Sequence, residues 1–147
     1  MILVSACLVG INCRYDGSNL LNNDLLKKIK AEDYVPVCPE QLGGLPTPRP
    51  RSSIQNGTGV EVIAGKAKVM DFNGNDVTKE FLEGAHESLK IAKFVGVKKA
   101  ILKENSPSCG VDFTHSNFKK VKGTGIFTAM LKNEGIKIFS EYTFEEI

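Results

Sequence analysis

Short apolar runs alternate with amphipathic segments along the chain, and this alternation is the feature that most restricts its fold. Runs of strand length occur at residues 2–6, 34–37, 99–103 and 136–139. Segments with apolar residues at helical spacing lie between them, at residues 23–31, 76–95 and 125–133. Strands that alternate with helices predict an α/β domain with a mostly parallel sheet and flanking helices, a Rossmann-like three-layer arrangement.

Two stretches interrupt this pattern. Residues 39–59 are rich in Gly, Pro, Ser and Thr, and a loop of that length in a compact domain is usually functional or mobile. Residues 60–63 and 67–70 are apolar and flank Ala64-Gly65-Lys66, which predicts a β-hairpin inserted into the α/β pattern.

The size and charge of the chain limit the classes of function. Its 147 residues predict one domain over residues 1–147. The 19 basic and 17 acidic side chains nearly balance, which gives no reason to expect binding to a nucleic-acid polymer or a membrane surface. Oligomeric state stays open.

The N-terminal run also bears on location. Residues 1–6 lack a basic segment before the apolar run and therefore predict a strand rather than a signal peptide. No apolar run reaches the length of a membrane span. We expect a cytoplasmic protein whose thiols stay reduced, so its four cysteines are expected to be ligands or nucleophiles rather than disulfides.

Three cysteines follow three of the expected strands. Cys7 comes after the first strand, Cys38 ends the second and Cys109 lies a few residues past the third. In a parallel sheet all three lie at the carboxyl edge, where open α/β sheets bind ligands. Soft thiolates select zinc, copper(I) or iron–sulfur clusters, and the absence of Cys-x-x-Cys spacing favours a cluster or catalytic metal over a zinc ribbon. The alternative is that each cysteine is a small buried apolar side chain.

Three segments resemble a bacterial family, long described as a domain of unknown function, that includes the 2-thiouracil desulfurases. The segments are Ser5-Ala6-Cys7-Leu8-Val9-Gly10-x-x-Cys13-Arg14-Tyr15-Asp16-Gly17, Cys38-Pro39-Glu40-x-x-Gly43-Gly44-Leu45-x-x-Pro48-Arg49 and Asn105-Ser106-Pro107-Ser108-Cys109-Gly110. The match continues in order to the Gly123-x-Gly125 helix start. The three motifs together are specific for this family, and the match as a whole extends over nearly the whole chain.

The resemblance implies a 4Fe–4S cluster held by only three cysteines, which in this chain are Cys7, Cys38 and Cys109. The fourth iron is left open. It also implies that Glu40 is the catalytic acid/base and that Ser106 is a catalytic serine. Cys13 matches a family position without an assigned role: it is a ligand in place of one of the three, a resolving thiol, or a packing residue.

These residues predict a reaction without electron transfer. A thiocarbonyl sulfur is a soft donor that binds the open iron, water attacks the carbon with Glu40 as general base, and the sulfur leaves as sulfide. Three further residues are predicted to bind the small thiolated substrate, namely Arg14, Arg49 and Ser108. The two arginines are alternatively counter-charges for the cluster or solvated loop residues.

Two other functions remain open at this point. One is a module that senses oxygen or carries sulfide through the cluster without catalysis, and the other is a metal-free cysteine enzyme. His86 and His115 lie outside the three motifs, which weakens the case for a Cys–His pair. His86 is expected at the surface; His115 follows the cysteine loop, and a surface position is favoured over one that lines the site. The glycines of Gly123-x-Gly125 are expected to allow close packing of the following helix against the sheet, with anion binding by backbone N–H groups as the alternative.

Overall fold

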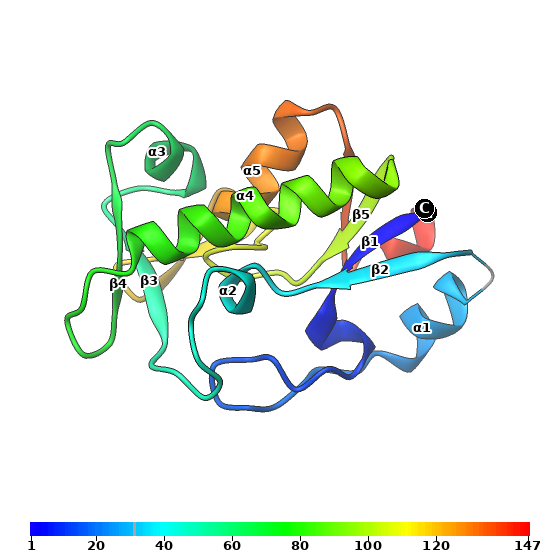
Figure 1. Cartoon of the computed structure of the whole chain (residues 1–147), viewed down its shortest axis with the longest axis horizontal. Helices are drawn as coiled ribbons and strands as arrows, with labels where there is room; N and C mark the ends of the chain where they lie inside the picture. Colours follow the sequence, from blue (N-terminus) through cyan, green and yellow to red (C-terminus); the bar gives the residue numbers. More distant parts are fainter. Residues whose placement is uncertain (31) are drawn as a thin grey trace.

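The computed structural model describes residues 1–30 and 32–147 (Figure 1). Its α-helices are α1 (Asn23–Ile29), α2 (Pro39–Leu42), α3 (Gly59–Ile63), α4 (Thr78–Val95) and α5 (Ile126–Asn133). Two 3₁₀ turns are η1 (Ala6–Val9) and η2 (Phe144–Glu146). The strands are β1 (Ile2–Ser5), β2 (Tyr34–Val37), β3 (Ser52–Gln55), β4 (Lys68–Asp71), β5 (Lys99–Leu102), β6 (Phe113–Ser116), β7 (Lys119–Lys122) and β8 (Lys137–Ser140).

A four-stranded parallel sheet forms the centre of the fold and confirms the predicted class. Its strands follow the order β2-β1-β5-β8, and every neighbouring pair is parallel. The short apolar runs account for this placement, because strands covered on both faces are apolar throughout rather than alternating. All four residues of β1 are buried.

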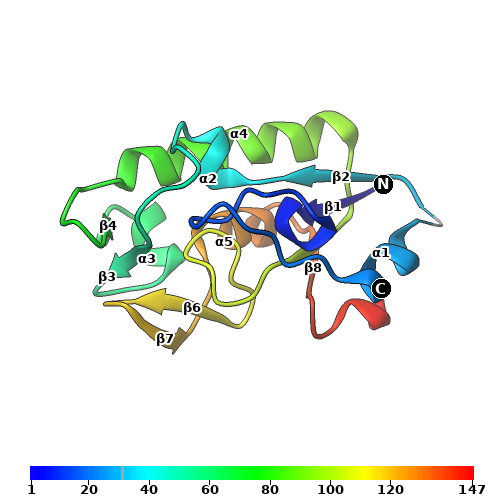
Figure 2. The ribbon, with the colours of Figure 1, turned by 90° about the horizontal axis from the view of Figure 1, so that it is seen from below.

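Helices cover both faces of this sheet, as the three-layer prediction requires. Leu3, Ala100 and Leu102 pack with residues of α4 and α5 in one core. Ile2, Val4 and Ile101 face the other way and pack with α1 and the two 3₁₀ turns. The side-chain alternation along β1 and β5 therefore divides the apolar residues between two layers. In Figure 2, α4 lies on one side of β2 and α1 on the other.

A second sheet, which the sequence did not predict, lies beside the first. Its order is β4-β3-β6-β7; β3 and β6 run parallel, whereas the two outer pairs are antiparallel. The strand β3 and the short helix α2 both form within residues 39–59, where only a loop was expected. Figure 1 shows α4 running across the molecule from the end near β4 toward β5.

The hairpin predicted at residues 60–63 and 67–70 is wrong. Residues 59–63 form α3, because Thr58 and Glu61 make a capping box in which Glu61 Oε1 accepts the Thr58 backbone N–H at 2.8 Å. The second predicted strand does form as β4, but it pairs with β3. The local hairpin of the structure is instead β6–β7.

The predicted helix boundaries hold with small shifts. Asn22 caps α1 by accepting the Leu25 N–H, and the expected end of this helix at Ala31 lies outside the described residues. The helix α4 begins at Thr78, two residues after the expected cap Asp76, whose carboxylate still accepts the Thr78 N–H at 2.9 Å. Among the described residues, none of the helices combines the length and the apolar character that crossing a membrane requires.

Two glycines bring α2 and α4 into backbone contact. A Cβ atom at Gly84 would overlap the carbonyl oxygen of Pro39, and a Cβ at Gly43 would overlap the carbonyl oxygen of Glu80. Only residues without a side chain permit this approach. The position of α2, and with it the start of the second motif, is therefore fixed by α4.

Candidate metal centre and active site

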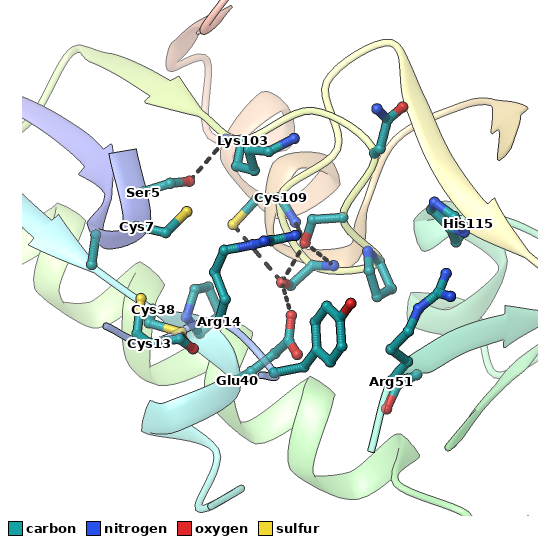
Figure 3. A pocket seen from close by; sticks show the side chains of 18 of the residues that line it. Ser5, Cys7, Cys13, Arg14, Cys38, Glu40, Arg51, Lys103, Cys109 and His115 are labelled. Atoms are coloured by element: carbon teal, nitrogen blue, oxygen red, sulfur yellow. Dashed lines mark hydrogen bonds between the residues drawn. The ribbon is translucent and has the colours of Figure 1, made fainter. Parts of the chain in front are cut away.

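The three cysteines predicted as ligands line one cavity at the carboxyl edge of the parallel sheet. This cavity has a volume of about 300 Å³, and Cys7, Cys38 and Cys109 all contribute to its wall. Figure 3 shows the sulfurs of Cys7 and Cys109 turned toward each other, with Cys38 and Cys13 side by side next to them. The strand order therefore brings together residues that lie far apart in the sequence.

Each cysteine leaves its strand through a different local structure. Cys7 lies in η1 directly after β1, and Gly10, with φ of 96°, ends this turn in a left-handed conformation that favours glycine. Cys38 is the N-cap residue of α2, where Pro39 suits the first helical position. Cys109 lies in the loop between β5 and β6.

The donor chemistry of this cavity fits a soft, multi-iron group. In the described part of the chain, no three Cys, His, Asp or Glu side chains are arranged to hold a single metal ion. Four cysteines nevertheless line the same cavity, namely Cys7, Cys13, Cys38 and Cys109, and a group with several metal atoms can bind thiols that do not converge on one ion. Iron–sulfur clusters are held by cysteine thiolates at separate iron atoms, which is the arrangement that such a donor set suits.

The surroundings raise the pKa values of Cys13, Cys38 and Cys109 in the absence of a metal. Burial raises the pKa of Cys109 to about 12 from an ordinary value of 9.0, with further raising by Cys38. The pKa of Cys13 is raised to about 11, since a lowering hydrogen bond with Cys38 is outweighed by Cys7 and by burial. The hydrogen bond with Cys13 and burial also raise the pKa of Cys38. A metal must therefore displace protons when it binds.

Glu40 lies in the first turn of α2 and is held by Arg49. The guanidinium Nε of Arg49 donates to Glu40 Oε1 at 3.1 Å. The other nitrogens of Arg49 donate to the carbonyl oxygen of Cys13 at 2.9 Å, to Thr47 Oγ1 at 3.1 Å and to the carbonyl oxygen of Pro46 at 3.3 Å. Arg49 thus joins the first and second motifs and fixes one carboxylate oxygen of Glu40.

The second carboxylate oxygen of Glu40 joins the third motif through two serines. The Ser106 hydroxyl oxygen accepts the backbone N–H groups of Ser108 and Cys109 at 3.1 and 3.0 Å. Because a hydroxyl has two lone pairs and one hydrogen, Ser106 then donates its own hydrogen to Ser108 Oγ, 3.0 Å away. Ser108 in turn donates to Glu40 Oε2 at 3.0 Å, a shorter contact than the 3.8 Å to Cys109 Sγ.

The helix start at Gly125 supports this serine loop. A Cβ atom at Gly125 would lie 2.5 Å from the carbonyl carbon of Ser108, and one at Gly59 would overlap Gly125 itself. The Ile126 and Phe127 N–H groups donate to the carbonyl oxygens of Pro107 and Ser108, each at 2.9 Å. The helix start at Gly125 therefore packs closely against the serine loop, whereas the sequence predicted close packing against the sheet.

Basic side chains surround the cavity. Arg14, Arg51 and Lys103 contribute to its lining together with Arg49, and the Arg14 and Arg51 guanidinium groups lie 5.5 and 5.9 Å from the centre of the Tyr15 ring. These cations can balance anionic sulfur at the site.

His115 also lines the cavity, which was the less favoured of the two positions considered from the sequence; His86 is exposed as expected. Burial, followed by the nearby charge of Arg51, lowers the pKa of His115. His115 lies in β6, and only the unpredicted second sheet brings it to the cavity. Arg51, Lys103 and Glu104 were also missed as lining residues; for Lys103 and Glu104, the signal was their place at the end of a strand.

Comparisons with known proteins match the chain over almost its full length. The family model of 2-thiouracil desulfurase matches residues 2–143. The uncharacterized protein YbbK of Bacillus subtilis (strain 168) is 43% identical over 150 residues, which span 100% of this chain and 99% of that protein. A solved structure of TudS, described as a 4Fe–4S-dependent thiouracil desulfidase, is 39% identical and superposes with a TM-score of 0.85, covering 99% of this chain and 93% of TudS.

Proposed function

Because the chain belongs to the 2-thiouracil desulfurase family, we propose that it is an iron–sulfur enzyme that replaces the sulfur of a thiolated nucleobase, or of a similar thiocarbonyl compound, by oxygen. The reaction consumes one water and yields a carbonyl compound and hydrogen sulfide, with no electron transferred. The observation that carries this proposal is that Cys7, Cys38, Cys109 and Glu40 line the same cavity, together with Cys13. The description of TudS as a thiouracil desulfidase supports the same reaction.

In this proposal Cys7, Cys38 and Cys109 hold a 4Fe–4S cluster. Support comes from their soft donor atoms, from their shared cavity and from the description of TudS as 4Fe–4S-dependent. When bound, a cluster with three protein ligands supplies one open iron, a soft Lewis acid suited to a thiocarbonyl sulfur. Arg14 and Arg49 offset the negative charge of the thiolates.

The side chains then move protons around the substrate carbon. Glu40 takes a proton from the attacking water at Oε2, the oxygen that Arg49 leaves free. Ser108 receives that proton while its own hydrogen passes to Ser106, and Ser106 gives its hydrogen to the substrate; one proton is moved and no hydroxyl is left charged. In the resting state the hydrogen bonds run the other way, with Ser106 donating to Ser108 and Ser108 donating to Glu40. In this proposal the substrate is bound by three residues that line the cavity, Arg14, Arg49 and Ser108.

The site offers little support for a metal-free thiol enzyme. A nucleophilic cysteine needs a lowered pKa, whereas the pKa values of Cys13, Cys38 and Cys109 are all raised. No hydrogen bond joins a histidine to a cysteine in the part of the chain that the structure describes. A protein that only senses oxygen or carries sulfide would not turn over a thiocarbonyl substrate, so measurement of turnover distinguishes these alternatives from the proposal.

The test is desulfuration by protein reconstituted with iron and sulfide without oxygen. With 2-thiouracil in ¹⁸O-labelled water, we expect free sulfide and ¹⁸O-labelled uracil in equal amounts. Glu40→Gln should keep its iron and lose about 10²- to 10⁴-fold in kcat, while Glu87→Gln, an exposed control on α4, should match the parent. An iron-loaded protein that releases no sulfide from 2-thiouracil or other thiocarbonyl compounds contradicts the proposal. Full turnover by Glu40→Gln removes the glutamate from it.

A further inference from the structure

Glu104 is a buried carboxylate that neither the motifs nor the proposed reaction uses. It lies two residues after the end of β5, is only 4% exposed and contributes to the cavity wall. No cation pairs with its carboxylate among the residues that the structure describes. The neighbouring Lys103 is engaged elsewhere, because its Nζ donates to Glu141 Oε2 at 2.9 Å and to the Glu104 backbone carbonyl at 2.7 Å.

Three consecutive backbone N–H groups bind one oxygen of Glu104. Oε1 accepts from Val111 at 2.6 Å, from Asp112 at 2.9 Å and from Phe113 at 2.9 Å. Successive N–H groups that converge in this way form a concave anion-binding nest. Charge-assisted hydrogen bonds of this kind are stronger than neutral ones, and here they offset the burial of the carboxylate.

These hydrogen bonds close the loop that carries the third motif. Glu104 stands at its start and Phe113 at its end, and the Asn105 N–H adds a bond to the Phe113 carbonyl oxygen at 3.1 Å. Ser106, Ser108 and Cys109 all lie between the two ends. The loop cannot open at its base without breaking the bonds to Glu104.

The closed loop is also tied to the parallel sheet. Glu141, which follows β8, accepts the Glu104 backbone N–H at 2.7 Å through Oε1. The same carboxylate holds Lys103 through its other oxygen. Glu104 therefore connects the edge of the first sheet, through its backbone, with β6 of the second sheet, through its carboxylate.

We propose that Glu104 is a positioning residue that holds the 105–112 loop in the shape that presents Ser106, Ser108 and Cys109 to the cavity. The expected effect of Glu104 on turnover rests on the proposed desulfuration. Its expected effect on the shape of the loop does not. Loss of the nest should release the loop, so that Ser108 no longer meets Glu40 and Cys109 no longer faces Cys7.

The matched control is Asp71, a carboxylate that makes similar bonds away from the cavity. Its Oδ1 accepts the Asn73 and Asn75 N–H groups, each at 2.9 Å, in the turn after β4, and the residue is 8% exposed. Asp71→Ala and Glu104→Ala thus remove comparable bonds. If Glu104 only stabilised the fold as a whole, Asp71→Ala and Glu104→Ala should disturb the cavity to the same extent.

The first experiment is amide hydrogen exchange on the metal-free protein, which needs no activity. In Glu104→Ala we expect the amides of Ser108, Cys109 and Val111 to exchange on the order of tenfold faster or more, with the β1 amides unchanged. Asp71→Ala should leave the loop amides as they are. Unchanged exchange at Ser108 and Cys109 in Glu104→Ala overturns the proposal.

The second experiment separates kcat from KM in iron-loaded protein. Glu104→Ala should lose about 10- to 100-fold in kcat because the reacting groups are misplaced, with a smaller change in KM. Glu104→Gln, which keeps an oxygen acceptor, should retain most of the kcat that Glu104→Ala loses. If Asp71→Ala lowers kcat as much as Glu104→Ala, the positioning role is wrong.

Two outcomes keep the tests independent. If the parent protein desulfurates no substrate, the proposed reaction fails and the exchange pattern alone decides the role of Glu104. If Glu104→Ala does not fold, Glu104→Gln decides it: weaker acceptance by the amide should speed exchange at Val111 and Phe113 relative to the parent, and identical exchange overturns the proposal.

Discussion

The Ser108 hydroxyl donates to Glu40 Oε2 at 3.0 Å, although 68 residues separate the two in sequence. This contact joins the second and third motifs across the cavity. Ser108 is 2% exposed, so its hydroxyl exchanges partners only within the site. A change at Ser108 therefore tests whether Glu40 and Ser106 act together.

Ser108→Ala should lower kcat by about 10- to 100-fold, because it breaks the path for a proton between Glu40 and Ser106. Iron content should stay at the parent level, since Cys109 keeps its backbone bonds to the Ser106 hydroxyl. The control is Ser53→Ala, another buried serine whose hydroxyl accepts the Phe118 N–H in the second sheet. Steady-state kinetics with iron analysis measures both, and an unchanged kcat in Ser108→Ala refutes the relay.

Gly84→Ala should destabilise the protein, although the same change inside a helix usually stabilises by about 0.5–1 kcal/mol. The new methyl group would overlap the Pro39 carbonyl oxygen, and overpacking of this kind costs about 1–3 kcal/mol. Because α2 begins at Pro39, the shift should also displace Cys38 and Glu40. Urea unfolding and iron retention are the measurements.

His86→Ala is the control for Gly84→Ala, since His86 is an exposed residue of the same helix and should change stability by less than about 0.5 kcal/mol. A Gly84→Ala protein at least as stable as the parent, with normal iron content, would show that α2 is free to move away from α4.

The sequence predicts the parallel sheet well because each of its strands is a local signal. Tyr34–Val37 forms with the expected bounds, and the cysteines fall at the expected strand ends. The second sheet lacks such signals: β3 lies in the stretch rich in Gly, Pro, Ser and Thr, and it meets β6 through one register pair, Ile54 with Ser116. Pairing between segments so far apart is decided by tertiary packing rather than by local pattern.

Residues 60–63 show why the hairpin prediction failed. Their Val and Ile content favours a strand, yet the Thr58–Glu61 capping box and the approach of Gly59 to Gly125 select a helix.

In the candidate site, too, some residues are marked by local sequence and others only by tertiary contacts. Cys7, Glu40 and Ser106 are recognisable from the motifs, whereas His115 and Arg51 reach the cavity only through the second sheet.

Cys13→Ala should retain the cluster, whereas Cys38→Ala should lose most of its iron. The backbone carbonyl oxygen of Cys13 accepts Arg49 Nη2 at 2.9 Å and Cys38 Sγ at 3.7 Å. A side-chain truncation removes the contacts of the Cys13 thiol with Cys7 and Cys38 but preserves both backbone bonds. Iron and sulfide analysis with electronic absorption spectra after reconstitution tests the ligand set. Loss of iron in Cys13→Ala, with retention in Cys38→Ala, would assign the ligands the other way round.

The metal-free, reduced protein should lose stability as the pH rises above about 9. In the unfolded chain a thiol ionises at its ordinary pKa of 9.0, whereas in the folded protein the pKa of Cys13 is about 11 and that of Cys109 about 12. Between these values the folded state holds more protons than the unfolded state, so the free energy of unfolding falls with rising pH. It should therefore be lower at pH 10.5 than at pH 8.

Lysine and tyrosine side chains titrate in the same range, so the measurement is a difference between proteins. Urea unfolding of the parent and of Cys109→Ala at both pH values should show a smaller loss of stability in the variant. Equal losses would mean that burial does not hold the proton on Cys109. Because the same protons must leave before iron can bind, the parent should also take up iron more readily at pH 8.5 than at pH 7, which a competing chelator can measure.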